Sequence, residues 1–140
     1  MDKCVHYGWW LFCLSSLFFN ATALASTLTG VRVWPSPDET RVVLDMTASP
    51  KYTSFSLSSP NRFVIDLKGV SKSTAELPQE NTEKSVLTKV RVSSPSKKGD
   101  FRLVMELNSS VKPTVFALPP NGNYGHRLVI DLPQIGRAHV

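Results

Sequence analysis

The chain has few of the side chains that carry thiol or metal chemistry. Of its 140 residues, two are cysteine and three are histidine. Both cysteines, Cys4 and Cys13, lie in the first 25 residues, which have the features of a removable leader. The chain after residue 25 therefore contains no thiol, which excludes a disulfide framework, a thiolate metal site and a cysteine nucleophile there.

The chain also lacks an apolar run long enough to span a membrane. The most apolar stretch, Trp9 to Phe19, is too short to cross roughly 30 Å of hydrocarbon. It follows Lys3 and precedes the small-x-small sequence Ala23-Leu24-Ala25, so residues 1–25 are predicted to be a secretory signal peptide. A twin-arginine start is absent, which favours the general secretory route and leaves no transmembrane segment after cleavage.

Acid–base and metal-ligand constellations are scarce as well. After residue 25 the histidines are His126 and His139, whereas zinc requires three or four His, Cys or carboxylate ligands, and a helix-borne HExxH spacing is absent. His126 is predicted to be a solvated loop residue, and no Ser, His and acid constellation stands out. We therefore predict no catalytic residue, no metal ligand and no cofactor in this stretch.

Acidic charge is in the minority. The chain contains sixteen Lys and Arg and eleven Asp and Glu. Removing residues 1–25 takes away Lys3 and Asp2, so the net charge stays at 15 − 10 = +5. In an exported protein, this balance favours anionic envelope polymers or lipid surfaces over nucleic acid as partners. A general solubility charge is the alternative.

What the chain has in abundance is one strand pattern, written four times. Arg, apolar, Val, apolar, acid, apolar occurs as RFVIDL at 62–67, RLVIDL at 127–132, RVVLDM at 41–46 and RLVMEL at 102–107. Successive side chains of a strand point to opposite faces, so each copy presents one apolar face and one face with Arg, Val and an acid. No stretch of ten residues shows helix periodicity. The apolar faces form the predicted core: Val42, Leu44, Met46, Phe63, Ile65, Leu67, Leu103, Met105, Leu107, Leu128, Ile130 and Leu132.

These strands belong to two copies of one longer unit. LTGVRV at 28–33 recurs as LTKVRV at 87–92, and the more polar strand at 52–57 recurs at 114–118. The second copy carries a five-residue insertion, 122–126, at a turn. Duplicated folds tolerate changes of length at turns, so the sequence indicates an internal duplication.

Each unit is predicted to form four strands with one apolar face, which is most simply buried against the duplicate. We predict an all-β fold, a duplicated β-sandwich of two symmetrical four-stranded sheets over residues 26–134. Its halves are 28–69 and 87–134, joined by a polar linker, 70–86, with at most a helical turn or two. A closed eight-stranded barrel is the alternative.

The order LTGVRV, TRVVLDM, FSLSSPNRFVIDLKG, LTKVRV, FRLVMEL and HRLVIDLPQ resembles the AMIN domain over residues 28–134. The resemblance implies two symmetrical four-stranded sheets and a non-catalytic role in the periplasm. That role is to bind peptidoglycan and to bring an N-acetylmuramoyl-L-alanine amidase of Gram-negative bacteria to the division septum, where septum proteins are further candidate partners. AMIN domains also occur in type IV pilus secretins, which supplies the alternative assignment.

In the amidases that the chain resembles, a catalytic domain that binds zinc follows the AMIN domain. This sequence ends at Val140, so the resemblance implies a piece truncated before that domain. Zinc and any amidase activity are then expected only in the missing part. The last residues, IGRAHV at 135–140, fit neither a linker nor a strand and are predicted to be a non-native tail.

The charged stripes of the repeated strands are candidate binding sites. Guanidinium groups grip carboxylates in bidentate fashion, so the stripes could bind the peptide-stem carboxylates of peptidoglycan, while the acids accept sugar hydroxyls. The alternative is structural. If two copies pair antiparallel with Val opposite Val, each Arg meets an acid, which is worth about 0–1 kcal/mol per exposed pair. The candidate residues on the stripes are Arg41, Arg62, Asp66, Arg102, Arg127 and Asp131.

Aromatic and lysine side chains near the loops are the remaining candidates. Trp34 and Tyr124 could stack on sugar rings, although Trp34, beside two prolines, could equally cap one end of the sandwich. The densest basic patch is Lys97-Lys98 with Lys89 and Arg91 nearby. It could attract an anionic wall or form a solvated hairpin tip.

Overall fold

The computed structural model describes residues 25–79 and 85–134. The signal peptide predicted for the first 25 residues, apart from its last residue, and the tail predicted at 135–140 lie outside these ranges. So does the part of the predicted linker at 80–84.

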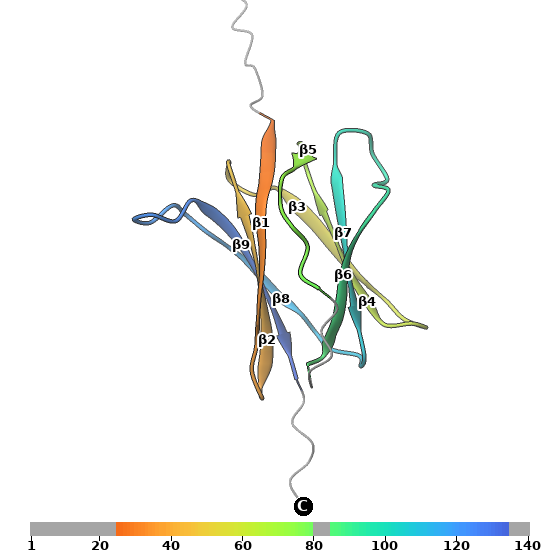
Figure 1. The fold of residues 1–140 in the computed structure, drawn as a ribbon. Coiled ribbons are helices and arrows are strands. Elements are labelled where there is room, and N and C mark those ends of the chain that lie inside the picture. The colour runs from red at the N-terminus through yellow and green to blue at the C-terminus, as the bar shows by residue number, and fades with distance from the viewer. Residues whose placement is uncertain (1–24, 80–84, 135–140) are drawn as a thin grey trace, which may run out of the picture.

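The described residues form strands and no helix, which confirms the all-β prediction (Figure 1). Each repeated pattern forms a strand whose ends lie within two residues of the expected ones, because its side chains alternate between the core and the outer face. The strands are β1 (Ser26–Pro35), β2 (Glu39–Met46), β3 (Tyr52–Leu57), β4 (Arg62–Leu67), β5 (Val70–Ser73), β6 (Leu87–Ser93), β7 (Phe101–Leu107), β8 (Thr114–Leu118) and β9 (His126–Pro133).

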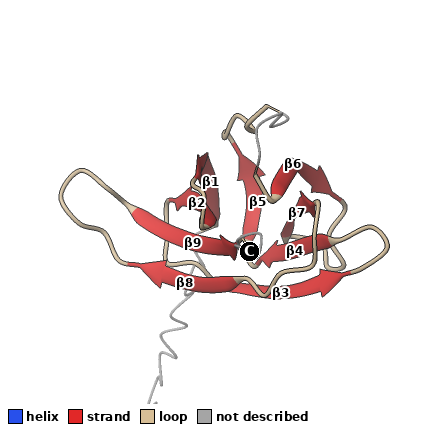
Figure 2. Ribbon diagram, turned by 90° about the horizontal axis from the view of Figure 1, so that it is seen from below, coloured by secondary structure: helices blue, strands red, loops and turns tan. Residues whose placement is uncertain are grey.

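Two sheets pack face to face, which confirms the sandwich over the barrel. Sheet A has five strands in the order β5-β1-β2-β9-β8, and sheet B has four in the order β3-β4-β7-β6. The view from below in Figure 2 shows β1, β2, β9 and β8 of sheet A on the left, the strands of sheet B on the right, and β5 between them.

The fifth strand of sheet A corrects the prediction for the linker. Residues 70–86 were expected to hold at most a helical turn or two, but Val70–Ser73 form β5, which pairs in parallel with β1. Val70 is fully buried. An apolar side chain directly after β4 gives this segment a place in the core, and its backbone groups then pair with the otherwise free edge of β1.

The two sheets do not correspond to the two halves of the sequence. The first half supplies β1 and β2 to sheet A but β3 and β4 to sheet B. The second half supplies β6 and β7 to sheet B but β8 and β9 to sheet A. The last strand of each half causes this exchange. β9 pairs with β2 and β4 pairs with β7, in each case with Val opposite Val. Each sheet is therefore built from one hairpin of each half, and the halves are interlocked.

The core lies between the sheets and matches the predicted apolar faces. Eleven of the twelve residues predicted for it are buried, and Leu107 is partly buried and packs against the others. The valines in the middle of the charged stripes are buried too, although they were assigned to the outer faces: Val43, Val64, Val104 and Val129. Their neighbours on the outer faces cover them, so these faces are not simple solvated surfaces.

Candidate functional site

The outer faces of the two sheets carry the same arrangement of side chains. On sheet A, three rows run across β1, β2, β9 and β8: Trp34-Arg41-Asp131-Thr114, Arg32-Val43-Val129-Phe116 and Gly30-Asp45-Arg127-Leu118. On sheet B, the rows run across β6, β7, β4 and β3: Ser93-Arg102-Asp66-Thr53, Arg91-Val104-Val64-Phe55 and Lys89-Glu106-Arg62-Leu57. We call these two surfaces face A and face B.

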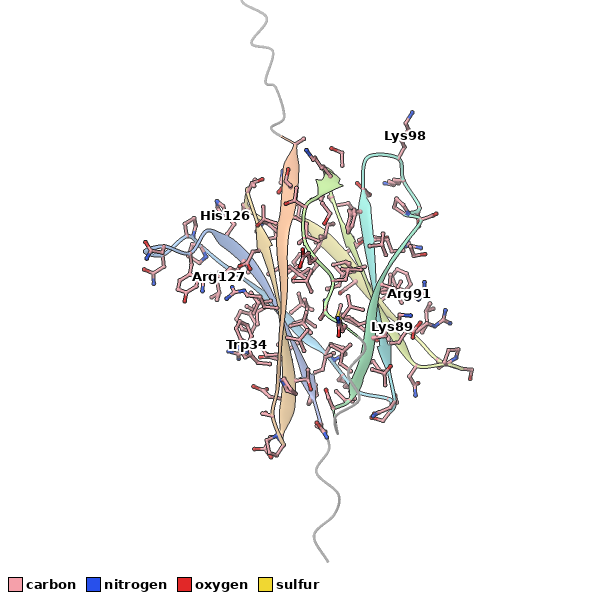
Figure 3. All side chains as sticks on the ribbon, in the orientation of Figure 1. Trp34, Lys89, Arg91, Lys98, His126 and Arg127 are labelled. Carbon is pink, nitrogen blue, oxygen red and sulfur yellow. The ribbon has the colours of Figure 1, made fainter. Side chains whose placement is uncertain are left out.

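The eight residues predicted to bind ligand do not form one site. Trp34, Arg41, Arg127 and Asp131 lie on face A, and Tyr124 reaches it from the loop between β8 and β9, whereas Arg62, Asp66 and Arg102 lie on face B. In a sandwich the two outer faces look in opposite directions. Figure 3 shows this arrangement, with Trp34 and Arg127 on one side of the molecule and Lys89 and Arg91 on the other.

Two of the four predicted arginines are used in ion pairs across the strands. Arg41 donates to both carboxylate oxygens of Asp131 at 2.8 and 3.0 Å, and Arg102 donates to both oxygens of Asp66 at 2.6 and 2.8 Å. The hydrogen bond and charge of each acid raise the pKa of Arg41 and of Arg102. For these four residues the geometry favours the structural alternative over ligand binding.

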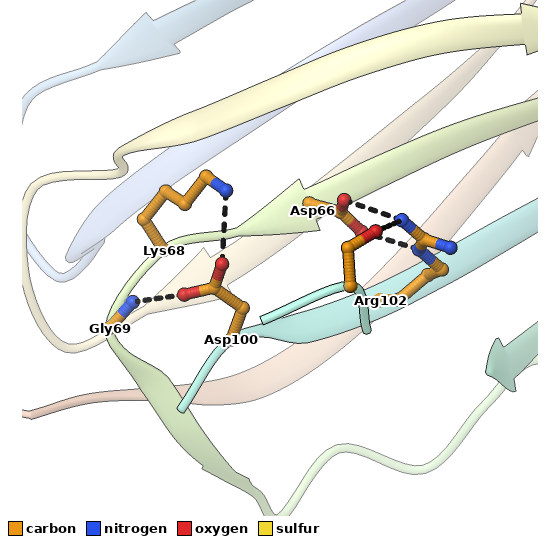
Figure 4. A network of polar contacts seen from close by, with 6 residues as sticks. Asp66, Lys68, Gly69, Asp100 and Arg102 are labelled. Atoms are coloured by element: carbon orange, nitrogen blue, oxygen red, sulfur yellow. Dashed lines mark hydrogen bonds and ion pairs between the residues drawn. The ribbon is translucent and has the colours of Figure 1, made fainter. Parts of the chain in front are cut away.

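The pair on face B belongs to a larger network, drawn in Figure 4. Arg102 also donates to Ser96, and near it Lys68 donates to Asp100 at 2.9 Å. The hydrogen bond from Arg102, with the charges of Arg102 and Lys68, lowers the pKa of the Asp66 carboxyl. The hydrogen bond from Lys68 likewise lowers the pKa of Asp100. This network joins the end of β4 to the start of β7.

Arg62 and Arg127 have no acid partner among the described residues, although each lies opposite an acid in the strand register. The acids opposite them instead form ion pairs with arginines of β1 and β6, the strands on their other side. Asp45 accepts two hydrogen bonds of 2.7 Å from Arg32, and Glu106 accepts one of 2.9 Å from Arg91.

The two arginines left over make only weak contacts with backbone oxygens. Arg62 donates through Nε to the carbonyl of Pro60 at 3.2 Å, and Arg127 donates through Nη2 to that of Pro119 at 3.3 Å. In the part of the chain that the structure describes, Nε of Arg127 is buried and has no hydrogen-bond partner. A buried donor without a partner costs about 1–3 kcal/mol, so Arg127 is the guanidinium most in need of an acceptor.

Face A is hollowed into a groove of about 550 Å³ beside Arg127. Its floor includes Val43 and Val129, and its sides include Arg32, Arg41, Trp34 and Tyr124. Trp34 is 49% exposed and Tyr124 is 56% exposed, so both rings are open to a ligand. The groove thus combines apolar, aromatic and guanidinium surface.

The guanidinium groups of the groove lie against its aromatic rings. Cζ of Arg32 is 4.9 Å from the centre of the Trp34 ring and 5.7 Å from that of Tyr124, and Cζ of Arg127 is 5.1 Å from the Tyr124 ring. These are cation–π distances. They place two cationic groups next to two exposed rings, and Arg127 is the one whose charge no acid neutralises.

Tyr124 owes its position to the insertion in the second half. Asn121 and Tyr124 exchange backbone hydrogen bonds of 2.9 and 3.0 Å, which close a tight turn at the tip of the β8–β9 hairpin. Figure 1 shows this hairpin extending beyond the rest of sheet A. The first half has no matching insertion, and Ser93 stands on face B where Trp34 stands on face A. Face B therefore lacks both rings of the groove.

Arg32 was not among the predicted site residues. The signal for it was present, because LTGVRV and LTKVRV place an arginine at the same position of each half. Gly30 explains how Arg32 can form its ion pair with Asp45, since a Cβ at Gly30 would lie 2.8 Å from Oδ2 of that carboxylate. The glycine leaves room for the acid to turn towards Arg32 and away from Arg127.

The remaining predicted candidates are not brought together. Lys98 lies at the tip of the β6–β7 loop, far from Lys89 and Arg91 on β6, so these residues do not form one basic patch (Figure 3). His126 is not a loop residue as expected but the half-buried first residue of β9, opposite Met46. Within residues 25–79 and 85–134, no group of three His, Cys, Asp or Glu is placed to hold a metal ion.

The same described ranges contain no helix of the length and apolarity that a membrane crossing would require.

Comparison with known proteins gives one family and two curated relatives. The family of the AMIN domain matches residues 30–132. N-acetylmuramoyl-L-alanine amidase AmiC of Escherichia coli O6:H1 is 33% identical over 132 residues, which is 88% of this chain and 29% of the amidase. The protein of the same name from Neisseria meningitidis serogroup B is 35% identical over 129 residues, 87% of this chain and 30% of the amidase. The chain thus spans about three tenths of the length of these relatives.

Proposed function

This chain belongs to the AMIN domain family, and we propose that it is the non-catalytic module that binds peptidoglycan and carries an N-acetylmuramoyl-L-alanine amidase to the division septum. The groove of face A is the observation that carries this proposal. Exposed tryptophan and tyrosine rings are the usual platforms for sugar rings, and a guanidinium without an acid partner is suited to a carboxylate. Peptidoglycan supplies both chemical groups.

The amidase assignment is preferred to that of a pilus secretin because both relatives described above are amidases. The described residues do not offer a zinc site, so we assign zinc and hydrolysis to a further domain of the complete protein. Peptidoglycan lies outside the cytoplasmic membrane, and we therefore assign the protein to the periplasm, which it reaches by the general secretory route through the signal peptide proposed at residues 1–25. Proteins of the septum are proposed as further partners.

Co-sedimentation with purified sacculi tests the wall-binding proposal. The purified protein is expected to pellet with sacculi at low salt and to be released in part at high salt, because the arginine contacts are screened. A variant with both rings removed, Trp34→Ala with Tyr124→Ala, is expected to remain in the supernatant. Protein that stays in the supernatant at low salt would refute wall binding.

The amidase proposal has a separate test. Purified protein incubated with muropeptides and zinc is expected to release no stem peptide, because within the described residues no group of three His, Cys, Asp or Glu is placed to hold the zinc ion. Metal-dependent release of stem peptide would show that the chain is itself an enzyme. Fluorescence microscopy of a tagged export form is expected to show a band at midcell, and a uniform periplasmic signal would contradict septal targeting.

A further inference from the structure

The groove on face A places a guanidinium group without an acid partner among the described residues close to exposed aromatic rings. Arg127 has no acid partner among the described residues, its Nε is buried without an acceptor, and its Cζ is 5.1 Å from the ring of Tyr124. Arg32 also lies against these rings, with its Cζ 5.7 Å from the centre of the Tyr124 ring and 4.9 Å from that of Trp34. A ligand that satisfies Arg127 must therefore also touch or approach these rings.

This spacing restricts where the carboxylate of a ligand can be attached. A carboxylate gripped by a guanidinium lies about 4 Å from its Cζ. A sugar ring stacked on Trp34 or Tyr124 is then within a few bonds of that carboxylate. A carboxylate borne by the sugar itself fits this distance, whereas the carboxylates of a stem peptide lie at least one residue farther from the glycan.

We propose that face A recognises peptide-free glycan, with the lactyl carboxylate of an N-acetylmuramic acid residue held by Arg127 and its sugar ring stacked on Trp34 and Tyr124. This inference rests on the proposed function and narrows its ligand. In intact peptidoglycan the lactyl carboxyl is blocked, because it forms the amide with L-alanine. Water added across that amide bond leaves a carboxylate on the sugar and an ammonium group on the released peptide.

The hydrolysis just described is the reaction for which both relatives are named. The module would then hold its enzyme on glycan from which peptide has already been removed. In this way, each cut would create a binding site next to uncut wall, and the enzyme would continue from regions already processed.

Face B provides a control within the same molecule. Arg62 matches Arg127 in the duplicated pattern, also lacks an acid partner in the described chain, and lies beside Leu57 as Arg127 lies beside Leu118. Face B has Ser93 in place of Trp34 and no counterpart of Tyr124. It can attract polyanions by charge, but it offers neither ring on which the sugar would stack.

The test compares three probes: glycan strands freed of peptide by an amidase, the same glycan with its stem peptides, and chitotetraose, which has no carboxylate. The purified protein is expected to bind the peptide-free glycan at least about tenfold more tightly than either other probe, as expected for one charge-assisted hydrogen-bond pair. Arg127→Ala and Trp34→Ser are each expected to remove this preference. Arg62→Ala is expected to retain it.

Folding is checked in the same experiment by the melting temperature. Among the described residues, neither Arg62 nor Arg127 takes part in an ion pair, so both alanine variants are expected to melt within a few degrees of the unchanged protein. Arg127→Lys serves as a second variant, because it keeps the charge and the packing of the stem but loses bidentate geometry.

The possible results separate this inference from the function on which it rests. Equal binding of glycan with and without stem peptides would overturn the inference and leave wall binding intact. Binding to none of the probes would overturn both. An equal loss on replacing Arg62 and Arg127 would overturn the assignment to face A.

Discussion

Face A and face B are two versions of one surface on opposite sides of the sandwich. Of the twelve positions in their rows, nine hold the same residue, and one exchanges Asp45 for Glu106. The remaining two exchange Trp34 for Ser93 and Gly30 for Lys89. The shared positions are those that strand pairing uses, and both differences lie on the first strand of a half.

The comparison separates the features that recur in both halves from those that occur once, and we propose that the former serve the fold and the latter a site. The pairs Arg41–Asp131 and Arg102–Asp66 occupy equivalent places, as do the phenylalanines Phe116 and Phe55, which lie 6.0 and 5.4 Å from the arginines of these pairs. These features recur because both sheets need them. The exposed rings of Trp34 and Tyr124 occur on face A only and have no structural counterpart, so we assign function to face A.

The largest effect is expected in the core, where the two sheets should be equivalent. Ile65 and Ile130 occupy matching positions and are both fully buried. Replacing either by alanine is expected to lower the free energy of unfolding by about 3 kcal/mol, with a difference of less than about 1 kcal/mol between them. Equilibrium unfolding in urea measures both values. A much larger loss at one position would show that the sheets contribute unequally to the fold.

The matching ion pairs are expected to differ, because their burial differs. The side chains of Asp66 and Arg102 are 7% and 19% exposed, whereas those of Asp131 and Arg41 are 16% and 46% exposed. Asp66→Asn is therefore expected to cost about 2 kcal/mol and Asp131→Asn less than about 1 kcal/mol in the same unfolding experiment. Equal costs would contradict the expectation that the more buried of the two matching pairs contributes more to stability.

Acidic pH should remove the stabilisation that Asp66 and Asp100 contribute to the network of face B. The pKa values of Asp66 and Asp100 are lowered in the folded protein, so at acidic pH the unfolded chain binds more protons than the folded one. The stabilisation is complete above the unfolded pKa and is lost as the pH falls below about 4. Unfolding curves between pH 6 and pH 3 should show this loss. The Asp66→Asn variant should show a smaller dependence, and an unchanged slope would contradict the role of Asp66.

The smallest change in stability is expected for Gly30→Ala, although the exposure of Trp34 on face A should increase. A methyl group there would displace the Asp45 carboxylate and loosen Arg32 from Trp34, with a change in unfolding free energy below about 1 kcal/mol. Trp34 is the sole tryptophan of residues 26–140, so a protein prepared without residues 1–25 reports on this ring alone. Quenching of its fluorescence by acrylamide is expected to increase in Gly30→Ala. Lys89→Ala, the matched change on face B, should leave the quenching unaltered.

Much of the fold could be predicted because its signals are local. The alternation in RFVIDL and its three repeats identified four strands and their buried faces. Pairing with Val opposite Val was considered without naming the partners, and the structure has it between Val43 and Val129 and between Val64 and Val104. The short strand β5 was missed because its four residues, Val70–Ser73, carry a single apolar side chain and no alternation. The exchange of hairpins between the halves was missed because a repeat indicates which strands are equivalent and not which of them are neighbours.

The site could be predicted only in part, for a different reason. Trp34, Tyr124 and Arg127 were identified as candidates, but the same reasoning gave equal standing to Arg41 and Arg102, which the structure places in ion pairs. Arg32 was overlooked because it lies outside the fourfold pattern, on the strand next to Asp45. Its effect on Arg127 depends on β1, β2 and β9 lying side by side.

The sequence by itself determined eight of the nine strands and their apolar faces. It also determined that an arginine faces an acid wherever two copies of the pattern pair antiparallel with Val opposite Val. These follow from the period of two and from the repeated order of residues. The tertiary structure decided which arginine each acid binds. Asp45 has an arginine on each neighbouring strand, Arg32 on β1 and Arg127 on β9, and the space above Gly30 lets it turn to Arg32. Arg127 is consequently left beside two exposed rings, because a carboxylate engaged by one guanidinium in bidentate geometry cannot serve a second in the same way.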